Sequence, residues 1–138
     1  MANIEHPDGT FSIGAASQIT GCNVETIRYY ERIGVLPAPD RSEGGHRIYV
    51  RDDLKRIGFV TRSRSLGFAL REIAEFLAQV DRGDFSCAEI KALTLDQIAS
   101  VKRKIEHLER MQEGLESLAA ACDGGQSPDC PIVDALYG

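Results

Sequence analysis

The sequence contains no hydrophobic run that approaches the roughly 20 residues needed for a membrane-spanning helix. Its first ten residues lack the apolar core of a secretory signal peptide, so we expect a cytoplasmic protein with no membrane partner. It also lacks a phosphate-binding glycine loop and any pairing of a nucleophile with a base. These absences argue against an enzyme and favour a protein that acts by binding.

Composition and charge divide the chain into two halves. The 138 residues are 43% hydrophobic and 27% charged, as in a packed soluble protein, and they suffice for one small domain plus an extension. The net charge of −5 is unevenly distributed. Residues 1–71 carry 10 Lys and Arg against 8 Asp and Glu, whereas residues 72–138 carry 6 against 13. An anionic polymer such as DNA is therefore expected to bind the N-terminal half.

Two short helices are predicted near the N-terminus. The first covers 13–19, with Ser12 as its cap, and the second covers 24–33 and stops at Gly34. Thr20, Gly21 and Cys22 form the turn between them. Two short helices around a glycine turn are typical of a helix-turn-helix.

A β-hairpin and two further helices are predicted next. Prolines and glycines between Leu36 and Gly45 exclude a helix, and residues 47–50 have strand character, which indicates a small wing. Asp52 and Asp53 suit the first turn of a helix that ends near residues 66–67. Another helix follows from about residue 70, and a polar break at 81–84 ends it.

One long helix is predicted from Cys87 to Cys122, where proline is absent and Gly114 is the only glycine. A helix of this length spans roughly 52 Å and has no globular domain to lie on, so its partner is expected to be a second copy of the chain. A Gly/Ser/Pro loop and a short helical turn at 131–136 complete the chain. The apolar residues of the expected coiled-coil seam are Ile98, Val101, Ile105, Leu108 and Leu115.

The predicted architecture is therefore mainly α, with a winged helix-turn-helix domain at 1–81 and a dimerisation helix with a metal-binding loop at 82–138. Arginine, polar and tyrosine side chains of the second helix and the wing are the candidates for phosphate and base contacts. The alternative for Tyr29 and Tyr30 is that either packs in the core. The predicted DNA-binding residues are Asn23, Thr26, Arg28, Tyr29, Arg41, His46, Arg47 and Tyr49.

Three of the four cysteines are candidates to bind a soft metal ion, because disulfides are rare in the cytoplasm. A single long helix would hold Cys87 and Cys122 roughly 50 Å apart, so one chain cannot bring both to one ion. An antiparallel dimer sets the start of one helix beside the end of the other. We therefore expect two sites per dimer, each with Cys87 from one chain and Cys122 and Cys130 from the other. Cys22 is interpreted as a small packed residue.

Five segments form a specific pattern that extends over much of the chain: Phe11–Gly14, Glu25–Glu31, Gly34–Leu36, Arg41–Tyr49 and Arg64–Phe68. In these segments the sequence closely resembles the MerR family of transcription regulators, and the resemblance covers nearly its whole length. The resemblance implies a winged helix-turn-helix and an antiparallel dimerisation helix. It further implies a homodimer that binds double-stranded promoter DNA with an overlong spacer and distorts it when the effector binds, so that RNA polymerase engages both promoter elements.

The identity of the metal rests on the thiolate count. Three thiolates fit trigonal Hg(II) best, with Pb(II), Cd(II) and Zn(II) as alternatives, whereas two suit linear Cu(I). The copper, silver and gold sensors of the family resemble this sequence but carry Ser where Cys87 stands. The spacing from Cys122 to Cys130 and the Asp129-Cys130-Pro131-Ile132 ending nevertheless look like those of the copper sensors. A thiol-redox regulator that uses Cys122 and Cys130 is the alternative function.

Overall fold

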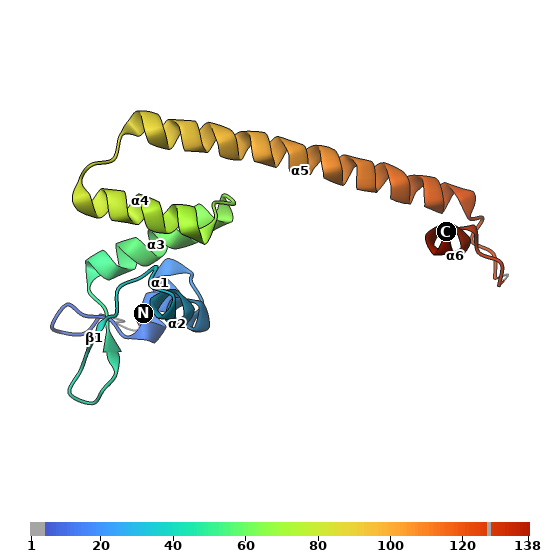
Figure 1. Ribbon diagram of the computed structural model, residues 1–138. Helices are drawn as coiled ribbons and strands as arrows, with labels where there is room; N and C mark the ends of the chain where they lie inside the picture. Colours follow the sequence, from blue (N-terminus) through green and yellow to red (C-terminus); the bar gives the residue numbers. More distant parts are fainter. Residues whose placement is uncertain (1–4, 127) are drawn as a thin grey trace. The chain divides into compact units, whose positions relative to one another are not determined.

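A computed structural model describes residues 5–126 and 128–138 (Figure 1). The chain forms two compact units, one ending at Ser86 and one comprising Cys87–Gly138, and each is described by itself. Ser127 of the predicted loop and residues 1–4 lie outside the described residues. The elements of the first unit are α1 (Ile13–Thr20), α2 (Val24–Arg32), β1 (Asp40–Arg41), β2 (Arg47–Ile48), α3 (Arg51–Ser65) and α4 (Leu70–Arg82).

Short-range interactions set the ends of these helices. The Ser12 hydroxyl accepts a hydrogen bond from the backbone N–H of Ala15 and caps α1, as predicted. Gly21 follows α1 with a φ of 73°, a left-handed conformation that glycine adopts without a steric penalty. The Asp53 carboxylate accepts from the backbone N–H of Val50 and so closes the start of α3.

The core of the first unit lies where α1 packs against α2 and α3, and where α3 packs against α4. Its most deeply buried large side chains come from three different helices, so burial ties the helix-turn-helix to the helices after the wing. These side chains are Ile27, Ile57, Val60 and Ile73.

The wing is an antiparallel pair in which Asp40 faces Ile48 and Arg41 faces Arg47. It is reinforced by the N-terminal segment, because Phe11 exchanges two backbone hydrogen bonds with Tyr49 and also bridges to Glu5. The sequence pattern did not predict this pairing. Its effect is to anchor the end of the wing to the residues that lead into α1.

The second unit consists of α5 (Cys87–Ala121) and α6 (Pro131–Tyr137), which contact each other. The 35-residue α5 confirms the predicted long helix, and none of the residues described along it is buried. No helix in the described part of the chain is long and apolar enough to cross a membrane. The mainly α fold is confirmed, whereas pairing of α5 in a coiled coil stays a prediction.

Candidate DNA interface and metal-binding cysteines

The turn between α1 and α2 fixes the N-terminus of the second helix. The Asn23 side chain accepts a hydrogen bond from the backbone N–H of Glu25 at 2.8 Å and caps α2. Asn23 is also exposed, so this predicted DNA-binding residue has a structural role beside any contact with DNA. Cys22 is buried in the turn, and burial raises the pKa of its thiol, which disfavours the thiolate that a metal ion requires.

Two faces of α2 differ in chemistry. Ile27 and Tyr30 are buried, whereas the Tyr29 ring is exposed and lies 5.6 Å from the guanidinium carbon of Arg32. Tyr30 therefore packs in the core, and Tyr29 stays accessible. Arg28 is paired with Glu25 at 2.7 Å on the exposed side. Such an exposed pair contributes little stability, so Arg28 can exchange its partner for a phosphate at low cost.

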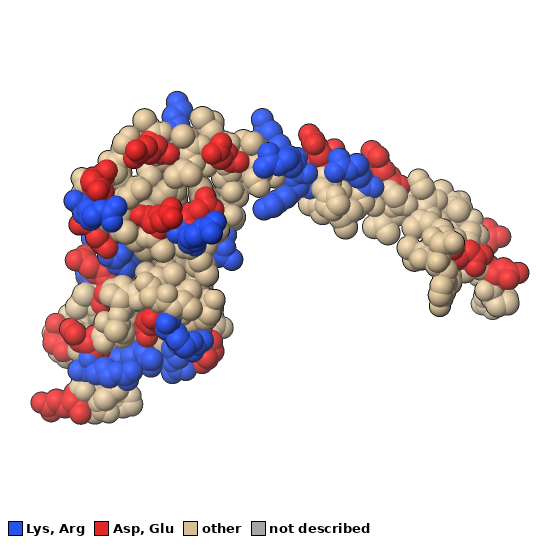
Figure 2. Space-filling model, in the orientation of Figure 1, with Lys and Arg blue, Asp and Glu red and all other residues tan. Residues whose placement is uncertain are grey.

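The two strands of the wing each carry an arginine, at positions that face each other. Arg41 lies directly opposite Arg47, an arrangement of like charges that is unfavourable unless an anion compensates it. The Arg41 guanidinium donates to the carbonyl of Gly45 at 2.8 Å. His46 is exposed beside the turn, where Gly45 has a φ of 80°. Figure 2 shows a band of Lys and Arg side chains at the end of the unit that carries α1, α2 and the wing.

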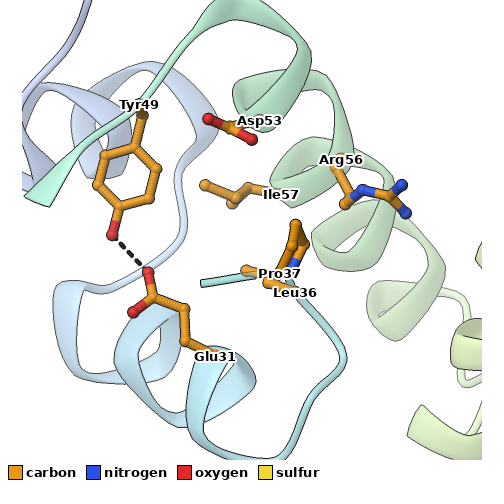
Figure 3. Close-up of a pocket in the computed structure, with 7 residues that line it drawn as sticks. All are labelled: Glu31, Leu36, Pro37, Tyr49, Asp53, Arg56 and Ile57. Carbon is orange, nitrogen blue, oxygen red and sulfur yellow. Dashed lines mark hydrogen bonds between the residues drawn. The ribbon is translucent and has the colours of Figure 1, made fainter. Parts of the chain in front are cut away.

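Glu31 joins the end of α2 to the wing, and sequence reasoning missed it. One oxygen of its carboxylate lies 2.8 Å from Nε of Arg47. The other oxygen accepts a hydrogen bond from the Tyr49 hydroxyl (Figure 3). Residues 47 and 49 are two apart in an extended segment and share a face, which is the signal that could have suggested a common partner.

Tyr49 lies in the core and not on the surface of the wing that the sequence predicted. It is only 2% exposed, and its hydroxyl donates a hydrogen bond to Glu31. Burial, together with the hydrogen bond to the Glu31 carboxylate, raises the pKa of Tyr49 well above its ordinary value. The chemistry of this residue is therefore that of a neutral hydrogen-bond donor inside the fold.

The three candidate metal-binding cysteines lie at the two ends of the second unit. Cys87 is exposed and begins α5, Cys122 follows the last residue of α5, and Cys130 directly precedes α6. The 35 residues of α5 separate Cys87 from Cys122 by roughly 50 Å. In the described residues, no three side chains of the metal-ligating types come together. The donors suit a soft metal, but one chain does not assemble them.

An apolar stripe runs along the exposed surface of α5. Every residue of the predicted seam is exposed, from Val101 at 39% to Leu115 at 65%. Leu95 and Met111, which lie near the seam, are also exposed. A stripe of this length on one helix is typical of a surface that pairs with another helix. Three consecutive basic residues, Lys102, Arg103 and Lys104, also belong to this helix.

Family models match most of the chain. One, described as MerR HTH family regulatory protein, matches residues 11–80, and a second, described as MerR, DNA binding, matches residues 54–118. The mercuric resistance operon regulatory protein of Bacillus cereus is 39% identical over 127 residues, which cover 91% of this chain and 96% of the relative.

Solved structures show the same fold with two different metals. The regulator PbrR691 from Ralstonia metallidurans, in complex with lead(II), is 37% identical, with a TM-score of 0.74 and coverage of 90% of this chain and 97% of that one. MerR from Bacillus megaterium, in complex with mercury(II), is 35% identical, with a TM-score of 0.66 and coverage of 88% and 95%.

Proposed function

Because the chain belongs to the MerR family of metal-responsive transcription regulators, we propose that it binds promoter DNA as a homodimer and activates transcription in response to Hg(II). The chain is a regulator and not an enzyme. One observation carries the proposal. The helix α5 has an unpaired apolar stripe along its length and candidate metal ligands at both of its ends.

The dimer follows from the energetics of α5. An isolated helix with such a stripe leaves many large apolar side chains in water, and burying each one stabilises an assembly by about 1.5–3 kcal/mol. Antiparallel pairing with a second copy buries the stripe. The same pairing brings Cys87 of one chain towards Cys122 and Cys130 of the other, so dimerisation completes the metal site.

The residues proposed to hold the metal are Cys87, Cys122 and Cys130. Three thiolates and no histidine form a soft donor set, which favours Hg(II) over Zn(II), since zinc usually takes four ligands. Binding requires each thiol to lose its proton, so affinity is expected to rise with pH. The relatives with mercury(II) and lead(II) support a divalent soft ion as the effector class.

DNA binding is proposed for the exposed side of α2 together with the wing. Arg28 and Arg47 supply phosphate contacts, and Thr26, Tyr29, Arg41 and His46 lie on the same elements. The exposure of Arg28, and of Arg47 in part, supports this assignment, because both side chains are accessible to a phosphate. With two such domains in a dimer, contacts on both half-sites offset the few kcal/mol that bending and untwisting DNA cost. In this scheme RNA polymerase then engages a promoter whose elements have been realigned.

The test is a competition titration under anaerobic conditions. Hg(II), Pb(II), Cd(II), Zn(II) and Cu(I) are each titrated against purified protein bound to a duplex selected from a random-sequence pool. Bound metal per chain and transcription from a promoter containing that duplex are measured. One Hg(II) per chain, with Hg(II)-dependent transcription, is expected.

Two outcomes would overturn the assignment of the effector. Transcription that responds only to Cu(I) would place the chain with two-thiolate sensors, and Cys87→Ser should then leave the response intact. A response to oxidant that persists without any metal would instead identify Cys122 and Cys130 as a redox switch. Neither outcome would affect the assignment of the fold or of DNA binding.

A further inference from the structure

Glu31 stands in a position that local chemistry disfavours. It is the second-last residue of α2, where the negative end of the helix dipole opposes a carboxylate. It is also on the element proposed to approach DNA, where a negative charge repels phosphate. Its side chain is nevertheless only 8% exposed. A buried charge in this place requires a compensating partner.

The partner of Glu31 is Arg47. Glu31 lines a small pocket together with Asp53 and Arg56 (Figure 3). The Arg56 guanidinium pairs with Asp81 on α4 and not with Glu31. The Asp53 carboxylate, which also lines this pocket, accepts a hydrogen bond from the backbone N–H of Val50. Among the described residues that line the pocket, Arg56 and Asp53 thus have partners other than Glu31. Glu31 forms its ion pair with Arg47 of the wing.

The geometry of the pair leaves Arg47 able to bind a second anion. Glu31 contacts Nε, which is one of the five N–H donors of a guanidinium. The side chain of Arg47 is 27% exposed, so its end is partly accessible to solvent. The Tyr49 hydroxyl donates to the other oxygen of the carboxylate, so Arg47 and Tyr49 do not share an acceptor. A planar guanidinium held at one edge presents its remaining donors in a fixed direction.

We propose that Glu31 is the residue that positions Arg47 for the DNA backbone. The carboxylate links the last turn of α2 to β2, so that the reading helix and the wing meet DNA in one fixed geometry. The inference rests on the proposed phosphate contact of Arg47 and adds to it a residue that does not itself touch DNA. Charge alone predicts that removing Glu31 strengthens DNA binding, whereas positioning predicts that removing it weakens DNA binding.

The experiment compares Glu31→Gln, Arg47→Ala and the double variant in full-length protein. Affinity for the selected duplex is measured at several salt concentrations, and a stoichiometric titration fixes the active fraction of each preparation. Removing an acid near DNA should tighten binding if only charge mattered. Positioning instead predicts that Glu31→Gln weakens binding about tenfold. Glu31→Gln should also reduce the slope of log affinity against log salt concentration by nearly as much as Arg47→Ala does. The reduction is about 0.9 for each phosphate that the protein no longer neutralises.

The double variant supplies the discriminating readout, because residues that act through one contact are not additive. Adding Glu31→Gln to Arg47→Ala should change affinity less than about twofold. Tyr49→Phe is the matched control, since it removes the other hydrogen bond of the same carboxylate and leaves the Arg47 pair in place. It should retain the wild-type salt slope.

Three results are decisive against the inference. Binding by Glu31→Gln that is as tight as wild type, or tighter, overturns it, as do additive losses in the double variant. A decrease of the salt slope in Tyr49→Phe equal to that in Glu31→Gln would show that the carboxylate acts through general packing. If Arg47→Ala itself leaves affinity and slope unchanged, the proposed phosphate contact has failed, and that result is distinguishable from a failure of positioning alone.

Discussion

The two units of this protein differ in how their apolar side chains are used. The first unit buries residues from α1, α2, the wing, α3 and α4 in a shared core, including Phe11, Ile27, Ile57 and Ile73. In the second unit, none of the described residues of α5 or α6 is buried. A domain with its own core folds and positions side chains by itself, whereas a long helix with a bare apolar stripe takes its stability from a partner. We therefore expect the DNA-contacting surface of each half-site to be complete within one chain, whereas each metal site needs residues from two chains.

The strongest way to break this comparison is to remove the proposed seam. Replacing both Ile105 and Leu108 with Asp should give monomers that no longer bind the selected duplex, because pairing of α5 would then bury carboxylates. Oligomeric state is measured by light scattering and DNA binding by anisotropy. The matched control, Ala99→Asp with His107→Asp, adds the same number of carboxylates at positions outside the apolar seam and should remain dimeric. A double seam variant that stays dimeric would contradict the role of α5.

The next largest effect concerns the shared metal site. Neither Cys87→Ser nor Cys122→Ser homodimers should keep a complete three-thiolate site. A mixed dimer with one variant chain of each kind places both defects in one site and leaves the other intact. Co-expression of two differently tagged chains should therefore restore one tightly bound Hg(II) per purified mixed dimer. A folded mixed dimer with no tight Hg(II) would defeat the proposal that each site is built from two chains.

Arginine substitutions sharpen the comparison by testing whether the two functions are separable. Arg28→Ala and Arg47→Ala should each weaken binding to DNA of any sequence, and each should flatten its salt dependence by about one unit of slope for every phosphate left without its arginine. Metal stoichiometry, measured on the same preparations, should not change, since both residues belong to the first unit. Unchanged affinity and slope in both variants would place the reading surface elsewhere.

The sequence predicted the helices well because their signals are local. The cap at Ser12, the glycine at 21, the acidic first turn of α3 and the proline-free stretch after Cys87 each act within a few residues. The match to relatives with lead(II) and mercury(II) then confirmed the family. The proposed metal site draws on the loop after Cys122 and on a second chain, and neither is defined by local signals.

What the sequence did not predict depends on long-range contacts. Glu31 meets residues 16 and 18 positions further along the chain, and Phe11 meets Tyr49 across an even longer separation. Tyr49 was expected to line the wing and contact DNA, together with Arg41, His46 and Arg47. The backbone pairing with Phe11 and the hydrogen bond to Glu31 hold it in the core instead. Alternation places residues 47 and 49 on one face of the strand, so periodicity alone does not predict that only Tyr49 is buried.

The smallest expected effect lies in the alkaline stability of the first unit. The pKa of Tyr49 is raised in the folded protein, so the folded state keeps its proton at a pH where the unfolded chain releases it. The stabilising effect is complete below the ordinary tyrosine pKa of about 10 and is lost as the pH rises towards the folded value. The free energy of unfolding should therefore fall above pH 10, by up to about 1.4 kcal/mol per pH unit from this group.

Tyr49→Phe should remove that contribution and flatten the decline, as measured by urea unfolding between pH 9 and about pH 11. Arg28→Ala, which leaves Tyr49 and Glu31 in place, should decline as the wild type does, and a decline that is equally steep in Tyr49→Phe would show that Tyr49 does not contribute to it.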